Sequence, residues 1–193
     1  MRSAALGEAG NRFTVSIENV VVLANLKRRI DLDRLAGEMP YAEYRPELFP
    51  GLVLRLREPK IGALLFSSGK MICTGAKSEV EAKRAALKVV EGLKECGVEI
   101  NEEPEIKTTN IVASGSVGGR IDLEKTARIL PRTIYETEQF PGLIYRMDDP
   151  KVVMLLFATG KFVCTGATME SEVYRALSKL REILEEKGLV TYT

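Results

Sequence analysis

The chain has 193 residues, of which 45% are hydrophobic and 28% are charged, and its formal net charge is +1. Histidine is absent, which excludes catalytic triads and metal sites that use histidine. The three cysteines have no zinc-site spacing, and no hydrophobic run approaches the roughly 20 residues of a membrane-spanning helix. We therefore expect no metal, no cofactor and no membrane association. A chain so close to neutral can bind nucleic acid only if its positive charge lies on one face.

The N-terminal quarter predicts a tail, a strand and a short helix. Residues 1–11 are rich in alanine and glycine and lack the apolar core of a signal peptide, so we expect a flexible tail. Residues 12–26 are rich in valine and isoleucine, which predicts a strand. The end of this strand is hydrophobic on both faces. Such a strand is either buried on both faces or has one exposed apolar face that binds a partner. Asp31 is the expected N-cap of a helix that stops at Pro40.

The next segment predicts four strands and a long helix. The strands are expected at 41–47, 52–57, 61–67 and 70–74, with a turn at Phe49-Pro50-Gly51 between the first two and a hairpin turn at Ser68-Gly69 between the last two. A helix follows over 78–96, ended by Gly97. Its predicted apolar stripe consists of Val80, Ala82, Ala85, Ala86, Val89, Val90 and Leu93.

Most of this pattern occurs twice. The segment 49–76 recurs 91 residues later as 140–167, without a gap and with 16 of 28 positions identical. The duplication predicts two half-domains, each with a strand, a helix, four strands and a helix. We expect ten antiparallel strands, an α+β fold, helices on one face of the sheet and an uncovered apolar second face. The predicted boundaries are a tail at 1–11, a first repeat at 12–97, a linker at 98–106 and a second repeat at 107–190.

The duplicated residues FPGL, R, PK, LLF, (S/T)GK and CTGA, preceded by an Asn-(Val/Ile)-Val strand, resemble the conserved core of the TATA-binding protein family, in its compact archaeal form. The resemblance covers about residues 12–190. It implies a saddle of two pseudo-symmetric repeats, with a curved ten-stranded antiparallel sheet and helices on the convex face. It also implies a general transcription initiation factor, not an enzyme, that binds TATA-box promoter DNA in the minor groove, kinks it by phenylalanine insertion, and recruits transcription factor B and RNA polymerase.

Four of the six phenylalanines are repeat partners, and within each copy the two are 17 residues apart. They are Phe49 and Phe66 in the first copy and Phe140 and Phe157 in the second. Packing in the core is the plain interpretation of such residues. A phenylalanine beside a Pro-Gly turn is poorly placed for a core, however, and the resemblance implies that each pair wedges between base steps.

Polar side chains also recur within the apolar strands. Asn19 and Asn110 are edge or turn residues in the plain interpretation, because an unpaired amide is costly inside a strand. The resemblance implies that both donate to minor-groove acceptors, together with the hydroxyls of Thr74 and Thr165. The apolar residues expected around them in the groove are Val21, Val112, Ile72, Val163, Leu64 and Leu155. Such a surface favours A·T-rich DNA, which has no guanine N2 amino group and kinks easily at TA steps.

Charged residues complete the predicted site. Six cations occupy matched positions and are expected to contact phosphates, although solvated surface charge is the usual interpretation of any one of them. They are Arg55, Lys60, Lys70, Arg146, Lys151 and Lys161. The turn of the second repeat is the more acidic of the two, and the resemblance implies that its Glu136 and Glu138 contact transcription factor B; simple solvation is the alternative.

The sequence leaves two rival functions open. A base-releasing repair enzyme on the same duplicated fold would need a base pocket and a catalytic acid or lysine. No aspartate, glutamate or lysine that occurs in only one of the two copies stands out for that role. A scaffold that holds transcription factor B without binding DNA would have lost the wedge phenylalanines, and all four are present. We expect a location in the cytoplasm with the nucleoid if the chain is archaeal and in the nucleus if it is eukaryotic. The sequence leaves open whether the free protein is a monomer or a homodimer that hides the apolar face.

Overall fold

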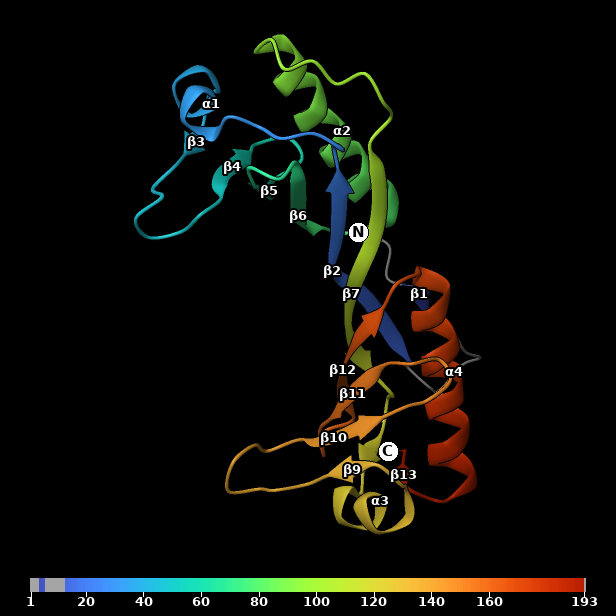
Figure 1. Cartoon of the computed structure of the whole chain (residues 1–193). Coiled ribbons are helices and arrows are strands. Elements are labelled where there is room, and N and C mark those ends of the chain that lie inside the picture. Colours follow the sequence, from blue (N-terminus) through green and yellow to red (C-terminus); the bar gives the residue numbers. More distant parts are fainter. Residues whose placement is uncertain (1–3, 6–12, 193) are drawn as a thin grey trace. The chain divides into compact units, whose positions relative to one another are not determined.

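A computed structural model of the chain describes residues 4–5 and 13–192 (Figure 1). The chain forms two compact units, which do not follow its linear order. Unit 2 is Asn19–Thr109, and unit 1 combines the chain up to Glu18 with the chain from Asn110 onward. Two long strands, β2 (Thr14–Asn25) and β7 (Glu105–Ser116), each contribute one half to each unit. These units are defined by contacts in space and differ from the two sequence repeats, whose boundaries stay a prediction.

Unit 2 contains an antiparallel sheet, a short helix and a long helix. Strands β3 to β6 follow each other in the sheet in chain order, and β6 pairs with the half of β2 that belongs to this unit. The long helix packs on β5 and β6. The elements are α1 (Leu32–Glu38), β3 (Ala42–Glu43), β4 (Leu52–Leu56), β5 (Ile61–Leu65), β6 (Lys70–Ala76) and α2 (Glu79–Glu95).

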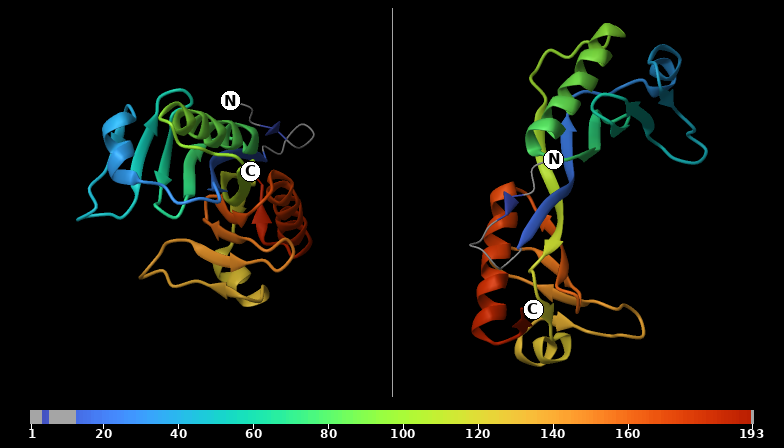
Figure 2. Two further views of the ribbon diagram at one scale, coloured as in Figure 1. Left: turned by 45° about the horizontal axis from the view of Figure 1, so that its top comes forward. Right: turned by 180° about the vertical axis from the view of Figure 1, so that it is seen from behind.

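Unit 1 repeats this arrangement. Strands β9 to β12 follow one another in the sheet, β12 pairs with the half of β7 in this unit, and the long helix packs on β12 (Figure 2). Two additional short strands, β8 and β13, pair with each other in a small separate sheet. The elements are β8 (Arg120–Ile121), α3 (Leu123–Ile129), β9 (Thr133–Ile134), β10 (Leu143–Arg146), β11 (Val153–Leu156), β12 (Lys161–Ala167), α4 (Glu170–Glu186) and β13 (Val190–Thr191).

The expected fold class is confirmed. Across the described residues the chain has two tandem repeats, four helices and a hydrogen-bonded path of ten strands, in the order β3-β4-β5-β6-β2-β7-β12-β11-β10-β9. One more strand, β1 (Ala4–Ala5), pairs with β2 off this path. Apart from those two residues, the predicted flexible tail lies outside the described part of the chain.

Two local expectations are wrong. The strand predicted over 41–47 is limited to β3, and the rest is loop, because Pro46 has no N–H to donate to a sheet ladder. Val80 does not belong to the buried stripe of α2 and is 70% exposed. At about 100° per residue, the nine positions from Val80 to the buried Val89 place the two side chains on opposite faces of the helix. The other predicted stripe residues of α2 are buried.

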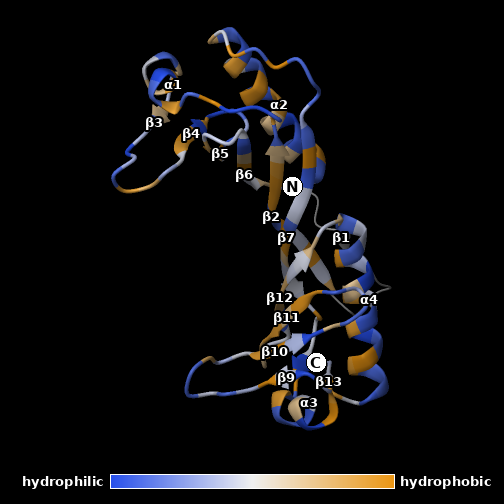
Figure 3. Cartoon of the chain, viewed as in Figure 1, coloured by the Kyte–Doolittle hydropathy of each residue, from blue (hydrophilic) through white to orange (hydrophobic). Residues whose placement is uncertain are grey.

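The loops between β3 and β4 and between β9 and β10 each extend away from the strands of their own unit (Figure 1). Each loop leads back to its sheet through a Phe-Pro-Gly sequence. Helix α4 has buried leucines on one face and charged residues on the other, and the alternation is visible in the hydropathy colouring of Figure 3. None of the helices in the described residues is long and apolar enough to cross a membrane.

Candidate nucleic-acid interface

One face of each sheet lacks a helix and carries rows of half-exposed apolar side chains. In unit 2 a row crosses four neighbouring strands, because consecutive residues in it are directly paired in the antiparallel register. It consists of Val53, Leu64, Ile72 and Leu23. The next pairs along these strands, such as Ala63 with Cys73, are buried on the helix side. Alternation along the strands therefore separates a core face from an open face.

Unit 1 has the matching row, in which a serine takes the place of one apolar residue; it consists of Ile144, Leu155, Val163 and Ser114. All four are half-exposed. The predicted groove residues Leu64, Ile72, Leu155 and Val163 thus lie on the open faces, as do Val21 and Val112 further along β2 and β7. Apolar surface of this kind, continuous over several strands, is typical of a face that binds a partner.

A repeated polar cluster lies on each open face. In unit 2, Asn19 Nδ2 donates to Thr74 Oγ1 at 3.0 Å, and Asn19 Oδ1 accepts from the backbone N–H of Gly75 at 2.7 Å. In unit 1, Asn110 Nδ2 is 3.4 Å from Thr165 Oγ1, and its Oδ1 accepts from the N–H of Gly166 at 2.8 Å. The backbone bond fixes which way the amide faces, so the NH₂ group points toward the threonine and still has a second hydrogen to donate.

Gly75 and Gly166 were not expected from the sequence, yet they make this cluster possible. Their φ angles are +108° and +98°, a region that side-chain-bearing residues rarely adopt. Each lies at an irregularity in the pairing of its strand. Their recurrence in both CTGA segments was the available signal. The bulge turns the glycine N–H toward the asparagine.

The predicted phenylalanine pairs come together in space. The ring centroids of Phe49 and Phe66 are 5.8 Å apart with an interplanar angle of 66°, and those of Phe140 and Phe157 are 5.8 Å apart at 67°. Each pair is an edge-to-face arrangement, which is the preferred geometry of aromatic rings. None of the four is buried, and Phe49 is 37% exposed, whereas Phe13 and Phe162 stack in the core of unit 1. Core packing is therefore not the role of the two surface pairs.

Glycine also permits the ring pairs. A Cβ at Gly51 would lie 2.7 Å from Phe49 Cε1 and 3.1 Å from Phe66 Cε1. A Cβ at Gly142 would make the same two contacts with its own pair, at 2.7 Å and 3.1 Å. A side chain at either position would push the rings away from each other. The sequence showed the repeated Pro-Gly turn, but not that its glycine contacts both rings.

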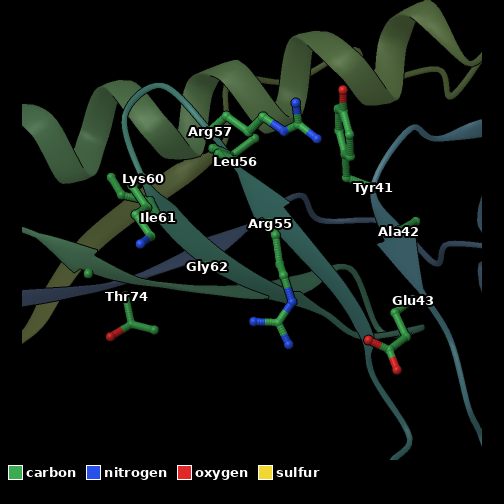
Figure 4. Close-up of a pocket in the computed structure, with 11 residues that line it drawn as sticks. Tyr41, Ala42, Glu43, Arg55, Leu56, Arg57, Lys60, Ile61, Gly62 and Thr74 are labelled. Atoms are coloured by element: carbon green, nitrogen blue, oxygen red, sulfur yellow. The ribbon is translucent and has the colours of Figure 1, made fainter.

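Exposed cations border the open faces. In unit 2, Arg55, Lys60 and Thr74 line a hollow of about 690 Å³, and Figure 4 shows Arg55 and Thr74 pointing to the same side of the sheet. In unit 1, Lys161 lines a second hollow of about 740 Å³ with Phe157 and Val163. All six predicted cations are exposed, and in the described part of the chain none of them forms an ion pair. No acidic side chain among the described residues therefore neutralises their positive charge in an ion pair.

Arg57, which has no basic counterpart, points to the other side of the sheet in Figure 4. Its guanidinium carbon is 4.4 Å from the centroid of the Tyr41 ring, a cation–π contact. The corresponding residues of unit 1 are Arg132 and Asp148, which form an ion pair. The 91-residue offset between the repeats matches these positions to each other. The structure adds that, in both repeats, the two side chains at these positions contact each other.

The acidic loop residues Glu136 and Glu138 are exposed between β9 and β10. The matching loop of unit 2 carries Arg45, which forms an ion pair with Glu43 at 3.2 Å. The two loops therefore differ in charge. Among the described residues no group of acidic and cysteine side chains could hold a metal ion. Cys73 and Cys164 are buried, and burial raises the pKa of each thiol to about 12.

A duplicated sheet with one helix-covered face, one open apolar face and exposed cations defines a class of proteins that bind an extended ligand through a sheet surface. The sequence model of the family described as transcription factor TFIID, or TATA-binding protein, matches residues 14–96 and 105–187. The chain belongs to this family.

Individual relatives agree with this assignment. A TATA-box-binding protein from Pyrobaculum islandicum is 49% identical over 177 residues, which cover 92% of this chain and 89% of the relative. One from Methanocaldococcus jannaschii is 48% identical over 172 residues, covering 89% and 94%. The solved structure of the Methanococcus jannaschii TBP superposes with a TM-score of 0.81 at 48% identity, covering 89% of this chain and 98% of that one. The chain is thus of the archaeal type and has the fold of a family of transcription factors.

Proposed function

We propose that the chain is a general transcription initiation factor that binds TATA-box DNA in the minor groove and bends it. The proposal rests on one observation: each unit has an open face, and both open faces contain the same three parts. These parts are an apolar row, an Asn–Thr–Gly cluster and an edge-to-face phenylalanine pair. Two such faces in one chain match a ligand that presents similar surfaces twice, as the two halves of a DNA site do.

The polar cluster supports selection of A·T pairs. In the minor groove, A·T and T·A pairs both present the acceptors adenine N3 and thymine O2. The amides of Asn19 and Asn110 have their carbonyl oxygens engaged by backbone N–H groups and offer N–H donors to such acceptors. A G·C pair adds the guanine N2 amino group, which would face an amide donor and an apolar row without a partner.

The phenylalanine pairs support bending. Inserting an apolar side chain between base steps unstacks them at a cost of about a few kcal/mol per step, and this family is the general example of such minor-groove kinking. Phe49 and Phe140 are held at the base of exposed loops, and each is backed by the ring of its partner, Phe66 or Phe157. A wedge that is already packed against a second ring loses little conformational freedom on insertion.

The remaining parts of the proposal concern charge and partners. The six cations would contact phosphates beside the apolar rows and release counterions from the DNA. The loop with Glu136 and Glu138 would bind transcription factor B and thereby bring RNA polymerase to the promoter, which would place the chain with the chromosomal DNA. Without DNA, two copies would dimerise through their open faces, since exposed apolar surface favours association.

A band-shift and bending assay tests the core of the proposal. We expect tight binding and a strong bend on a duplex with a TATA box, and weaker binding by at least about tenfold when G·C pairs replace the box, since each mismatched pair typically costs about 1–3 kcal/mol. A Phe66→Ala, Phe157→Ala double variant should bend the TATA duplex less while it keeps its circular dichroism spectrum.

The matched control is a Phe13→Leu variant, because Phe13 is stacked in the core of unit 1 and not on an open face. It should lower the unfolding temperature and leave the bend angle unchanged. Equal affinity for the TATA and G·C duplexes would refute the sequence-specific part of the proposal. An unchanged bend in the double variant would refute the wedge role. Release of a base from damaged duplexes would instead favour the repair enzyme.

A further inference from the structure

An exposed turn of three cations connects β2 to α1 in unit 2. It has the sequence Lys-Arg-Arg at residues 27–29, and we call it the basic turn. Its two ends are bonded to the hairpin between β5 and β6. The N–H of Leu26 donates to the carbonyl oxygen of Gly69, and the N–H of Ile30 donates to that of Ser67, both at 2.9 Å. The basic turn is therefore fixed against this hairpin.

The same hairpin carries two residues of the proposed DNA interface. Phe66 and Lys70 stand at its two ends, and the N–H of Phe66 donates to the carbonyl oxygen of Lys70 at 2.9 Å. The backbone of Arg28 touches the hairpin between them, because a Cβ at Gly69 would lie 3.0 Å from the carbonyl carbon of Arg28. The basic turn thus lies next to the wedge of unit 2 and to one of the six proposed phosphate contacts.

Two of the three cations have no acidic partner. Arg28 and Arg29 are exposed, and within the described residues neither forms an ion pair. Asp31 and Glu99 line a hollow of about 230 Å³ together with the two arginines but form no ion pair with them. Lys27, in contrast, is paired with a glutamate at 3.2 Å. The two arginines therefore carry the charge that the basic turn can offer to an anion.

Unit 1 has no equivalent of this arginine pair. The positions that match 27 and 28 are Gly118 and Gly119, and only the third cation recurs, as Arg120. Gly119 is buried under β13, because a Cβ there would lie 2.7 Å from the carbonyl oxygen of Thr191. Arg120 is itself paired with that strand, as part of β8. The arginine pair is thus a difference between two units that share the apolar row, the polar cluster and the phenylalanine pair.

We propose that Arg28 and Arg29 bind phosphates of the DNA just outside the box, next to the half-site that unit 2 binds. This inference rests on the proposed minor-groove function, in which the wedge of unit 2 marks a kink and the duplex continues past it. Guanidinium groups suit phosphates because they form two parallel hydrogen bonds with them. Such contacts carry no base preference, but they lengthen the site on one side only. The protein therefore prefers the direction that places unit 2 toward flanking duplex.

The test uses a palindromic A·T box, on which the two directions of binding are equivalent. Three duplexes carry the box alone, the box with about ten flanking base pairs on one side, and the box with the same flank on both sides; about ten base pairs are one helical turn. Dissociation constants are measured at several salt concentrations for the unaltered chain and for Arg28→Gln combined with Arg29→Gln. The matched control is Lys83→Gln combined with Arg84→Gln, which removes the same charge from exposed positions on α2.

We expect the first flank to strengthen the binding of the unaltered chain about tenfold and to raise the magnitude of the salt slope by about two units. The second flank should add no more than about twofold, since it only makes both directions of binding equally favourable. The double variant of Arg28 and Arg29 should lose the gain from the first flank, while it binds the box alone as well as the control variant does. The control variant should keep the gain.

Either of two results would overturn the inference. Equal gains from the first and the second flank would show that both units hold flanking duplex, so that the arginine pair of unit 2 makes no difference. A gain from the first flank that persists in the double variant of Arg28 and Arg29 would show that other groups bind the flank. If the unaltered chain binds the box alone no better than a G·C duplex of equal length, the proposed function itself fails, and that result does not depend on the flanks.

Discussion

At the scale of single residues, the surface phenylalanine pairs depend on neighbours that have no side chain. Gly51 and Gly142 lie against both rings of their pair, and even one added methyl group would stand 2.7 Å from a ring carbon. Carbon atoms in van der Waals contact are about 3.5–4.0 Å apart, so a ring would have to move. In the proposed function, these glycines set the distance between the two halves of each wedge.

We therefore expect Gly51→Ala combined with Gly142→Ala to reduce the DNA bend angle and to lower stability by about 1–3 kcal/mol, the usual cost of overpacking. The bend is measured by fluorescence energy transfer between dyes at the two ends of a TATA duplex, and stability by urea denaturation. Gly37→Ala is the matched control, because nothing lies within 4 Å of a Cβ at that position in α1. It should stabilise the chain by about 0.5–1 kcal/mol and keep the full bend. A full bend in the double variant would show that ring spacing is unimportant.

The sequence predicted much of the site at this scale, because duplication marks the residues that both repeats need. The repeat and the resemblance pair Phe49 with Phe66, and the structure brings the two rings together. They assign Asn19 and Thr74 to the same acceptors, and the structure adds the hydrogen bond between them. The role of Gly75 required a backbone angle, and the bond between Glu18 and Ser114 joins residues 96 positions apart that are not repeat partners. Neither follows from periodicity or from matched positions.

At the scale of elements, the two long helices start differently although they end alike. In α2 the N-cap Ser78 accepts from the N–H of Glu81 at 3.1 Å, and Glu81 accepts from the N–H of Lys77 at 2.7 Å. In α4 the N-cap is Met169, which is 51% exposed. This helix relies on Glu172, whose carboxylate accepts from the N–H of Thr168 at 2.8 Å.

Those backbone hydrogen bonds, that of Thr168 first, lower the pKa of Glu172 below its usual value. Because folding lowers this pKa, the stabilisation is present above the pKa of the unfolded chain and is lost as the pH falls through the folded value. The start of α4 should therefore weaken in acid. A serine hydroxyl at position 169 would supply a cap that does not depend on the ionisation of Glu172.

Met169→Ser should stabilise the chain by about 0.5–1 kcal/mol, because serine is a favoured N-cap and the exposed methionine gives up little packing. The midpoint of urea denaturation at neutral pH measures the gain, with Ser78→Ala in α2 as the reverse substitution, which should cost about 1 kcal/mol. If Met169→Ser leaves the midpoint unchanged while Ser78→Ala lowers it, the carboxylate of Glu172 already provides all the capping that α4 can use.

Sequence periodicity was reliable for the elements that alternate or repeat regularly over many residues. It identified the apolar stripe of α2, of which every predicted residue except Val80 is buried. It failed at the short elements, where one or two residues decide. The strand expected to end at Glu47 is limited to β3. Strands β8 and β13 form only because they pair with each other, Val190 with Ile121 and Thr191 with Arg120. No local sequence pattern predicts this pairing.

At the scale of the whole molecule, a net charge of +1 is combined with a local excess of positive charge. Some of the acidic residues are engaged in ion pairs with other cations, for example Asp149 with Arg175 and Glu185 with Arg181. The six cations beside the open faces are exposed and make no ion pair within the described residues. DNA affinity should therefore depend on salt as for a basic protein, despite the neutral balance.

If all six cations contact phosphates, log K for a TATA duplex should fall with log salt at a slope of about −5. Removing one contact by Lys70→Gln or Lys161→Gln should reduce the magnitude of the slope by about one unit each. Arg57→Gln is the matched control, because Arg57 lies against Tyr41 on the other side of the sheet and should leave the slope unchanged. The slope is obtained from affinities measured at several salt concentrations between about 50 and 300 mM, a range over which the screening length shortens. A slope near zero would mean that the cations are only solvated.

The exchange of strand halves between the units has a consequence for the origin of the chain. Cut between Asn101 and Pro104, the polypeptide would yield two pieces, and each would hold a stretch that belongs to the unit of the other: 13–18 in the first piece and 105–109 in the second. Neither piece alone completes its sheet. A chain with only one repeat would have the same deficiency, which an exchange of strands with a second copy of itself would correct. A chain that carries both repeats completes both sheets by itself, and its two halves can differ at positions such as 18 and 109.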